Sequence, residues 1–201
     1  GEIREISVFS SDIRKFTSIS EAMTPEQLVL LLNEYFNEMV AVISRHEGTI
    51  DKFIGDAILA IYGAPRAVEK HGLKAVRAAL EMRQRLDSLR IKWLSEGKPE
   101  IRIGMGVATD SAIVGNVGSS TRLNYTAMGD GVDLADTLEV ATKLYRVAII
   151  ISENTWIQSR EEVLTRELDL VKVEGHARPL RIFEAVEARA GATDPPLARA
   201  G

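Results

Sequence analysis

The sequence predicts an α+β fold with a ferredoxin-like βαββαβ core and additional strands, in which helices pack on one face of a mostly antiparallel sheet. Segments with strand and helix periodicity follow one another in the order strand, helix, strand, strand, helix, strand over residues 3–107. The chain has 201 residues, and 45 % of them are hydrophobic. This size and composition suit one domain with a well-buried core.

The first strand and the first long helix have clear local signals. Residues 3–13 read as a strand that leads into a polar turn. Thr24 is suited to cap a helix, because Pro25 follows at the first helical position and Gln27 can complete a capping box. Apolar residues then recur at helical spacing as far as Ile43, so this segment is expected to be an amphipathic helix.

A β-hairpin is expected next, followed by the second long helix. The hairpin arms are residues 49–54 and 58–62, and Gly55 with Asp56 supplies the tight turn between them. The second helix is expected over residues 67–95, because glycine and proline follow it closely.

The second half of the chain is expected to extend this core. The alternation of apolar residues from 101 to 107 is typical of a strand, and Ser152 is suited to cap a short helix. The other expected elements are strands at 113–117, 122–128, 147–151, 167–174 and 180–187, and a helix over 132–144. Residues 188–201 are rich in Ala, Gly, Pro and Arg and predict a disordered tail, so the domain is expected to span 1–187.

The composition excludes several kinds of chemistry and partner. A net charge of −4 supplies no large positive field for nucleic acid, and the lack of cysteine excludes disulfides and thiolate metal sites. No apolar run approaches the ~18–20 residues of a membrane span, and no signal pattern opens the chain, so direct membrane insertion is not expected. Catalysis would therefore rest on carboxylates, hydroxyls, Lys, Arg and a bound metal or cofactor.

Asp12 and Asp56 are the candidate metal ligands. Asp12 stands where the first strand ends and Asp56 in the hairpin turn, so neighbouring positions in one sheet would bring both carboxylates to one edge. Hard oxygen ligands suit Mg²⁺ or Mn²⁺, completed by phosphate oxygens and water, and a pair of ions could activate a hydroxyl and stabilise a leaving phosphate. The alternative is that Asp12 caps the next segment and Asp56 only forms the turn.

Five ordered motifs resemble those of the class III nucleotide cyclase catalytic domains. They are Phe9 to Thr17, Phe53 to Ala60, Val114 to Gly118, Asn124 to Asp130, and Leu138 with Glu139. The resemblance implies a reaction in which the ribose 3′-hydroxyl of ATP or GTP attacks the α-phosphorus and pyrophosphate leaves. It also implies a head-to-tail pair of domains, in which one chain supplies the metal ligands and the other supplies the groups that bind the base and the transition state.

The resemblance also implies roles for individual residues. Asp12 and Asp56 match the ligands of two Mg²⁺ or Mn²⁺ ions, and the backbone of Ile13 would help to hold one ion. Lys52 matches the purine-recognising lysine, and Thr126 matches its partner. Because lysine donates to an acceptor on adenine, this combination favours ATP as substrate, whereas the alternative for Lys52 is a solvated lysine on a strand.

The chain departs from the family pattern at five places, which include Lys15 and Thr109 to Ser111, and three of them fall on residues expected to bind the nucleotide. Asp133 stands where an asparagine normally orients the ribose, Thr137 where an arginine contacts the phosphates, and Glu174 where a lysine helps to neutralise the triphosphate. Asp133 and Thr137 are four residues apart and share one helical face. The loss of one transition-state donor typically costs ~10²–10³ in rate. A homodimer is therefore expected to be weak or inactive, whereas a complementary chain could restore one site per heterodimer.

The sequence leaves three functions to be weighed. The first is an adenylate cyclase domain of a signalling protein, with ATP as substrate and the cytoplasm as its expected compartment. The second is a catalytically degenerate cyclase homology domain that acts as a nucleotide-binding, dimerisation or regulatory module. The third is an unrelated ferredoxin-like domain, which the five ordered motifs disfavour.

Overall fold

The computed structural model describes residues 1–190, so residues 191–201 of the expected tail lie outside the described residues. The core elements are, in chain order, β1 (Glu2–Ile13), α2 (Pro25–Arg45), β2 (Thr49–Ile54), β3 (Ala57–Tyr62), α3 (His71–Ser95) and β4 (Ile103–Ser119). Their strands lie in the order β2-β3-β1-β4, and every neighbouring pair is antiparallel. This arrangement confirms the predicted ferredoxin-like core.

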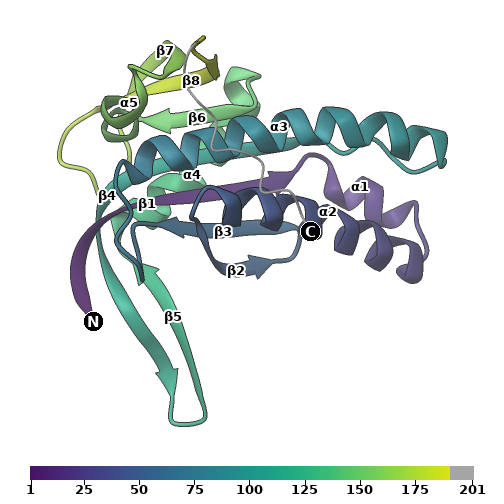
Figure 1. Cartoon of the computed structure of the whole chain (residues 1–201), viewed down its shortest axis with the longest axis horizontal. Coiled ribbons are helices and arrows are strands. Elements are labelled where there is room, and N and C mark those ends of the chain that lie inside the picture. Colours follow the sequence, from purple (N-terminus) through teal and green to yellow (C-terminus); the bar gives the residue numbers. More distant parts are fainter. Residues whose placement is uncertain (191–201) are drawn as a thin grey trace.

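Four further strands complete an eight-stranded sheet. β6 (Ile149–Ser152) runs parallel to β4, and beyond it β8 (Leu180–Ala188) and β7 (Val163–Val171) continue the sheet in antiparallel pairs. β5 (Arg122–Met128) pairs only with the second half of β4. The hairpin that β4 and β5 form projects away from the body of the domain (Figure 1).

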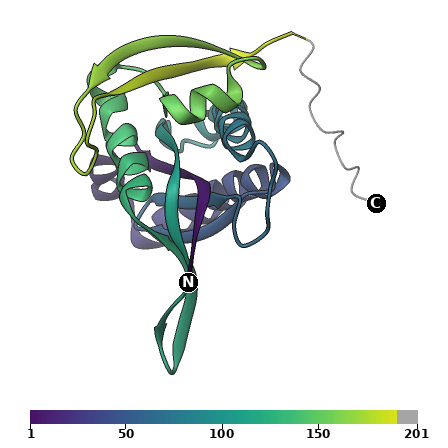
Figure 2. The same ribbon diagram turned by 90° about the vertical axis from the view of Figure 1, so that its left-hand side faces the viewer.

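Helices cover both faces of the sheet, which corrects the expectation that they lie on one face. α2 and α3 pack on one side over a core that includes Phe9, Tyr35 and Met105. α4 (Asp130–Tyr145) packs on the other side, where Leu134 joins residues such as Val8 in a second core (Figures 1 and 2). The cause is visible in the strands, since β3 is apolar on both of its faces and both must be buried.

Local sequence signals position the elements as predicted at three places. The Thr24 side chain accepts a hydrogen bond from the Gln27 backbone, and the Gln27 side chain accepts one from the Thr24 backbone. Ser152 caps α5 (Glu153–Ser159) by accepting from the backbone of Thr155. Gly55 adopts a φ of 64° in the turn between β2 and β3, a conformation that glycine reaches without a steric cost.

Several boundaries differ from the predicted ones. A short helix, α1 (Phe16–Glu21), occupies the predicted polar turn, and six residues are too few to show helical periodicity. α3 begins four residues after position 67, because Lys70 takes a left-handed conformation immediately before it. The polar stretch between 107 and 113 does not break the strand, since β1 pairs with β4 through it. β7 begins at Val163 rather than 167, and two register shifts along it hide its alternation.

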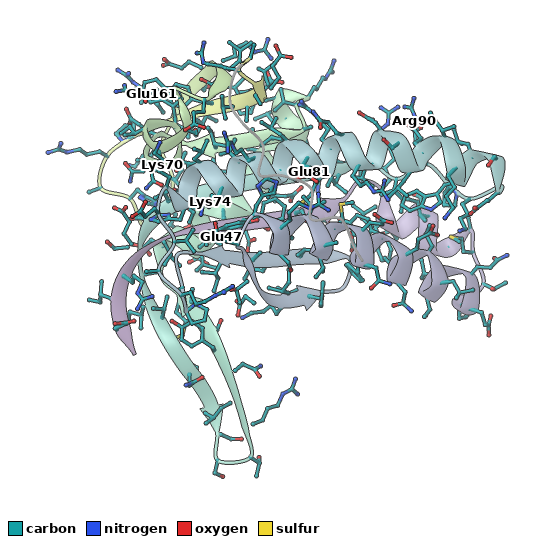
Figure 3. All side chains as sticks on the ribbon, in the orientation of Figure 1. Glu47, Lys70, Lys74, Glu81, Arg90 and Glu161 are labelled. Carbon is teal, nitrogen blue, oxygen red and sulfur yellow. The ribbon has the colours of Figure 1, made fainter. Side chains whose placement is uncertain are left out.

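Ion pairs join the outer surfaces of α2 and α3. Glu34 accepts from Lys92 at 2.6 Å and from Lys98 at 2.7 Å, and Arg85 pairs with Glu38 at 2.6 Å. Figure 3 shows other members of this charged surface projecting from α3, among them Glu81. No helix of the described residues is long and apolar enough to cross a membrane.

Glu34 should make stability depend on pH. Its hydrogen bond with Lys92, and then that with Lys98, lowers its pKa from 4.5 to about 2. A lowered pKa in the folded state stabilises the fold above the unfolded value, and this contribution is lost as pH falls from about 4.5 towards 2. We expect Glu34→Gln to lower the free energy of unfolding by about 0.2–1 kcal/mol at pH 7 and by much less at pH 2.

Urea denaturation at both pH values measures this difference, with the exposed Glu26→Gln on the same helix as the control. An equal loss of stability at pH 7 and pH 2 would contradict the ion-pair explanation.

Gly106 should be indispensable to the packing of α4 on β4. A Cβ atom at this position would clash with the carbonyl oxygen of Ala135 and lie 2.5 Å from the backbone nitrogen of Glu139. We expect Gly106→Ala to lower the free energy of unfolding by at least about 1–3 kcal/mol, because the obstacle is backbone. Thermal or chemical denaturation measures this, and Gly115→Ala, which approaches only Gly1, should cost far less.

Candidate functional site

The structure brings Asp12 and Asp56 together at one edge of the sheet. Asp12 lies next to the end of β1, and Asp56 lies in the turn that leads into β3, the antiparallel neighbour of β1. The Asp56 Oδ2 atom accepts a hydrogen bond from the Ile13 backbone N–H at 2.9 Å. Burial and a hydrogen bond with Asp12 raise the pKa of Asp56 to about 6, so the two carboxyl groups are in direct contact.

The chemistry of this pair fits a divalent cation. Two carboxyl groups in contact repel each other when ionised, and the ion pair nearest to them is that of Lys143 Nζ with Asp12 Oδ2 at 3.7 Å. The Ile13 N–H already donates to Asp56, so the carbonyl oxygen of Ile13 is the backbone group that remains available to bind an ion. Across residues 1–190, no group of three or more His, Asp or Glu could hold a metal alone. An ion here would therefore need ligands from outside the chain, such as phosphate oxygens and water.

Lys52 and Thr126 form a second cluster together with Asp51. Lys52 Nζ donates to Thr126 Oγ1 at 3.3 Å, although the two residues lie on different strands, β2 and β5. The buried carboxylate of Asp51 accepts from Thr126 Oγ1 at 3.0 Å and pairs with Lys52 Nζ at 3.3 Å. The sequence analysis predicted Lys52 and Thr126 but missed Asp51, because nothing in the sequence marks it as buried.

Asp133 and Thr137 lie on one exposed face of α4, as their spacing predicted. The Thr137 hydroxyl donates to the backbone carbonyl of Asp133 at 2.9 Å. The Thr137 hydroxyl proton is therefore bound within the helix and is not available to a ligand. Neither Asp133 nor Thr137 presents a cationic donor.

Glu174 lies in an exposed turn after β7 rather than in the strand that was predicted to contain it. The next residue, Gly175, has a φ of 83°, and a Cβ atom there would lie 3.2 Å from the Asp130 carboxyl group. The turn therefore packs against the start of α4, the end of the helix that also carries Asp133. No hydrogen bond or ion pair among the described residues joins Asp12 or Asp56 to this acidic region.

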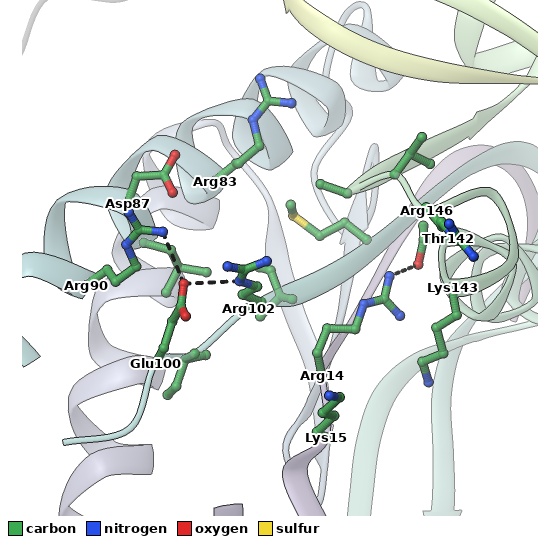
Figure 4. Close-up of a pocket in the computed structure, with 16 residues that line it drawn as sticks. Arg14, Lys15, Arg83, Asp87, Arg90, Glu100, Arg102, Thr142, Lys143 and Arg146 are labelled. Carbon is green, nitrogen blue, oxygen red and sulfur yellow. Dashed lines mark hydrogen bonds and ion pairs between the residues drawn. The ribbon is translucent and has the colours of Figure 1, made fainter. Parts of the chain in front are cut away.

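A basic cavity of about 790 Å³ has Lys143, the ion-pair partner of Asp12, in its lining, although Asp12 and Asp56 do not line it themselves. Its cations come from the turn after β1, from α3, from the C-terminal end of α4 and from the segment between α3 and β4 (Figure 4), and they are Arg14, Lys15, Arg83, Arg90, Arg102, Lys143 and Arg146. Only Asp87 and Glu100 oppose them, and Glu100 accepts at 3.1 Å from both Arg90 and Arg102. Nothing in the sequence predicts this cavity, because only Arg14 and Lys15 lie in one of the five motifs and its other residues come from distant segments.

The comparisons with known proteins agree with one another. The model of the adenylate and guanylate cyclase catalytic domain family matches residues 1–184. Adenylate cyclase 1 of Rhizobium meliloti is 38 % identical over 183 residues, which are 91 % of this chain and 28 % of that protein. The chain spans between 9 % and 36 % of the length of the first three curated relatives that it matches.

Solved structures show the same fold. The adenylyl cyclase CyaB from P. aeruginosa superposes with a TM-score of 0.86 at 35 % identity, over 94 % of this chain and 97 % of that one. The guanylyl cyclase Cya2 superposes with a TM-score of 0.81 at 33 % identity, over 96 % of each chain. Adenylyl and guanylyl cyclases are thus both among the relatives, so the likeness alone does not choose between ATP and GTP.

The carboxylate pair should bind Mn²⁺ only when both members are present. We expect Asp56→Asn to weaken Mn²⁺ binding at least about tenfold, because one anionic ligand is lost and the remaining one lacks a partner. Electron paramagnetic resonance during an Mn²⁺ titration measures the affinity. A non-hydrolysable ATP analogue is present to complete the coordination of the ion. The exposed Glu26→Gln is the control, and Mn²⁺ affinity unchanged by Asp56→Asn would contradict the assignment.

Proposed function

This chain belongs to the adenylate and guanylate cyclase catalytic domain family, and we propose that it forms cyclic AMP and pyrophosphate from ATP as one member of a dimer. The observation that carries the proposal is the contact between Asp12 and Asp56, whose ion-pair partner Lys143 also lines a basic cavity. Lys143 thus links a pair of hard ligands for ions to a group of cations that could bind phosphates.

The residues of this chain would have distinct tasks in the reaction. Asp12, Asp56 and the Ile13 carbonyl would hold Mg²⁺ or Mn²⁺, ions that lower the barrier to attack by a hydroxyl and stabilise a leaving phosphate when bound. Lys52 and Thr126 would bind the base and so fix the ribose relative to the phosphates. The 3′-oxygen then forms a bond to the α-phosphorus as the bond to the pyrophosphate oxygen breaks.

ATP is the substrate that the second cluster favours. The Lys52 ammonium can only donate, and adenine presents a ring nitrogen as an acceptor next to its amino group. Because Lys52 contacts Thr126, both residues can reach one edge of the same base.

Exposed apolar side chains support the assembly of two domains. Ile54 at the end of β2 is 60 % exposed, Val140 and Leu144 on α4 are 59 % and 77 % exposed, and Leu123 on the projecting hairpin is 61 % exposed. These surfaces flank the two candidate clusters, so a second cyclase domain that covers them would also close the site. The partner is either a second copy of this chain or a complementary cyclase domain.

The substituted positions favour weak activity in a homodimer. Asp133 and Thr137 offer no cation on the face of α4, and Glu174 adds a negative charge near the start of the same helix. The cations of the basic cavity would offset part of this loss at the triphosphate. They do not replace the lost ribose and transition-state contacts of the other chain.

A second function rests on the same observation. With its metal and base clusters assembled and its transition-state positions replaced, the domain could bind ATP tightly without turnover and act as a dimerisation or regulatory module. The domain would work in the cytoplasm, where ATP is available, as the output part of a longer signalling protein.

Restoring the family residues should raise activity. We expect the domain alone to form cyclic AMP slowly, and Asp133→Asn, Thr137→Arg and Glu174→Lys together to raise kcat by about 10² or more. Cyclic AMP formation from ATP with Mn²⁺ measures this, and Asp12→Ala in the restored background should abolish the gain.

The control for this assay is Asp136→Asn, which changes an exposed acid on α4 that no family motif uses. No gain in the triple variant, with ATP binding intact, would favour the regulatory module. Cyclic AMP formation that survives Asp12→Ala would overturn the metal role.

A further inference from the structure

Asp51 contributes a buried side chain to the cluster that contains Lys52 and Thr126. Its side chain is 1 % exposed, although it carries a negative charge. One oxygen, Oδ2, lies 3.0 Å from Thr126 Oγ1 and 3.3 Å from Lys52 Nζ. The other oxygen, Oδ1, is buried and has no hydrogen-bond partner among the described residues. Buried polar atoms are normally paired, so a free buried acceptor beside a binding cluster needs an explanation.

The hydrogen-bond polarity of this cluster follows from elementary chemistry. A hydroxyl can donate or accept, but a carboxylate can only accept. The Thr126 proton must therefore point to Asp51, and the lone pairs of Thr126 Oγ1 are what remains for other groups. Lys52 can only donate, and it lies between the same two oxygens. The cluster thus presents one donor, the ammonium, next to one acceptor, the polarised hydroxyl.

With the hydroxyl opposite position 6 of the purine and the ammonium opposite the neighbouring ring nitrogen, this acceptor and donor match adenine and mismatch guanine. Adenine has an amino group at position 6, which donates, beside a ring nitrogen that accepts. Guanine has a carbonyl oxygen at position 6, which accepts. An unconstrained threonine hydroxyl could rotate to serve either base, so Thr126 alone does not choose between them.

We propose that Asp51 is a specificity-determining positioning residue, which holds the Thr126 hydroxyl as an acceptor so that the site reads the 6-amino group of adenine. The proposal rests on the proposed function and goes beyond it, because it assigns the choice of base to a residue that is itself too buried to be the main contact. It also gives a role to a carboxyl group at this place, whose printed hydrogen bond and ion pair go to the two groups that would meet the base.

Asp51→Asn tests the proposal, because an amide can donate to Thr126 and so release the hydroxyl proton towards the ligand. Competition binding with non-hydrolysable ATP and GTP analogues in the presence of Mg²⁺ gives the ratio of the two affinities without requiring turnover. We expect the preference for the ATP analogue to fall at least about tenfold, mainly through weaker ATP binding. The same ratio should be unchanged in the exposed control Glu26→Gln.

Thr126 variants keep the test decisive if Asp51→Asn does not fold. Thr126→Ser retains a hydroxyl for Asp51 to orient and should keep the preference, whereas Thr126→Val should lose it. If the hydroxyl acts through Asp51, Asp51→Asn should change the ratio no further in the Thr126→Val background.

The outcomes separate this proposal from the one on which it rests. Wild-type binding that prefers the ATP analogue, with a ratio unchanged by Asp51→Asn, overturns the role of Asp51 and leaves the cyclase proposal in place. A wild-type chain that binds neither analogue overturns both. A lower ratio in Asp51→Asn and Thr126→Val, with Thr126→Ser like the wild type, supports the role of Asp51.

Discussion

The contact between Asp12 and Asp56 is the interaction on which the proposed function of this domain depends. It exists because β1 and β3 are antiparallel neighbours, so that the end of one strand meets the turn before the other. The Ile13 backbone N–H fixes one of the two carboxyl groups, and burial makes the repulsion between them costly. A cation relieves that cost, which links a feature of sheet topology directly to metal-dependent chemistry.

Charge is distributed unevenly around this contact, and under the proposed function this distribution assigns different tasks to the two chains of a dimer. The chain carries a net charge of −4, yet seven cations line the basic cavity. Acidic side chains gather instead near the start of α4, where Asp130, Asp133 and Glu174 lie. Under the proposed function, this chain carries the residues expected to hold ions and phosphates, whereas the positions expected to stabilise the transition state for a partner are substituted.

The sequence predicts most of the fold because its signals are local. The capping box at Thr24, the hairpin turn at Gly55 and the cap at Ser152 depend only on nearby residues, and the structure confirms all three. The boundaries that differ have non-local causes. β4 runs unbroken through a polar stretch because β1 pairs with it from Ile103 to Val114, and α4 covers the second face because the strands of the core are apolar on both sides.

The candidate site is predictable to the extent that motifs describe it. Asp12, Asp56, Lys52 and Thr126 belong to recognisable motifs, and the structure places them in two assembled clusters. Asp51 and the basic cavity depend instead on which residues of distant segments meet, such as Arg14 and Lys143. No pattern in the chain records those meetings, so only the three-dimensional structure shows them.

The proposed assignment of metal-binding and transition-state groups to different chains is tested most directly by mixing two proteins with complementary defects. One is the wild-type chain, with its metal cluster intact. The other carries Asp12→Ala together with Asp133→Asn, Thr137→Arg and Glu174→Lys. Each homodimer has a defect in both sites, whereas a mixed dimer has one site without any. The account predicts cyclic AMP formation in the mixture well above the sum of the separate proteins, and a mixture no more active than that sum would contradict it.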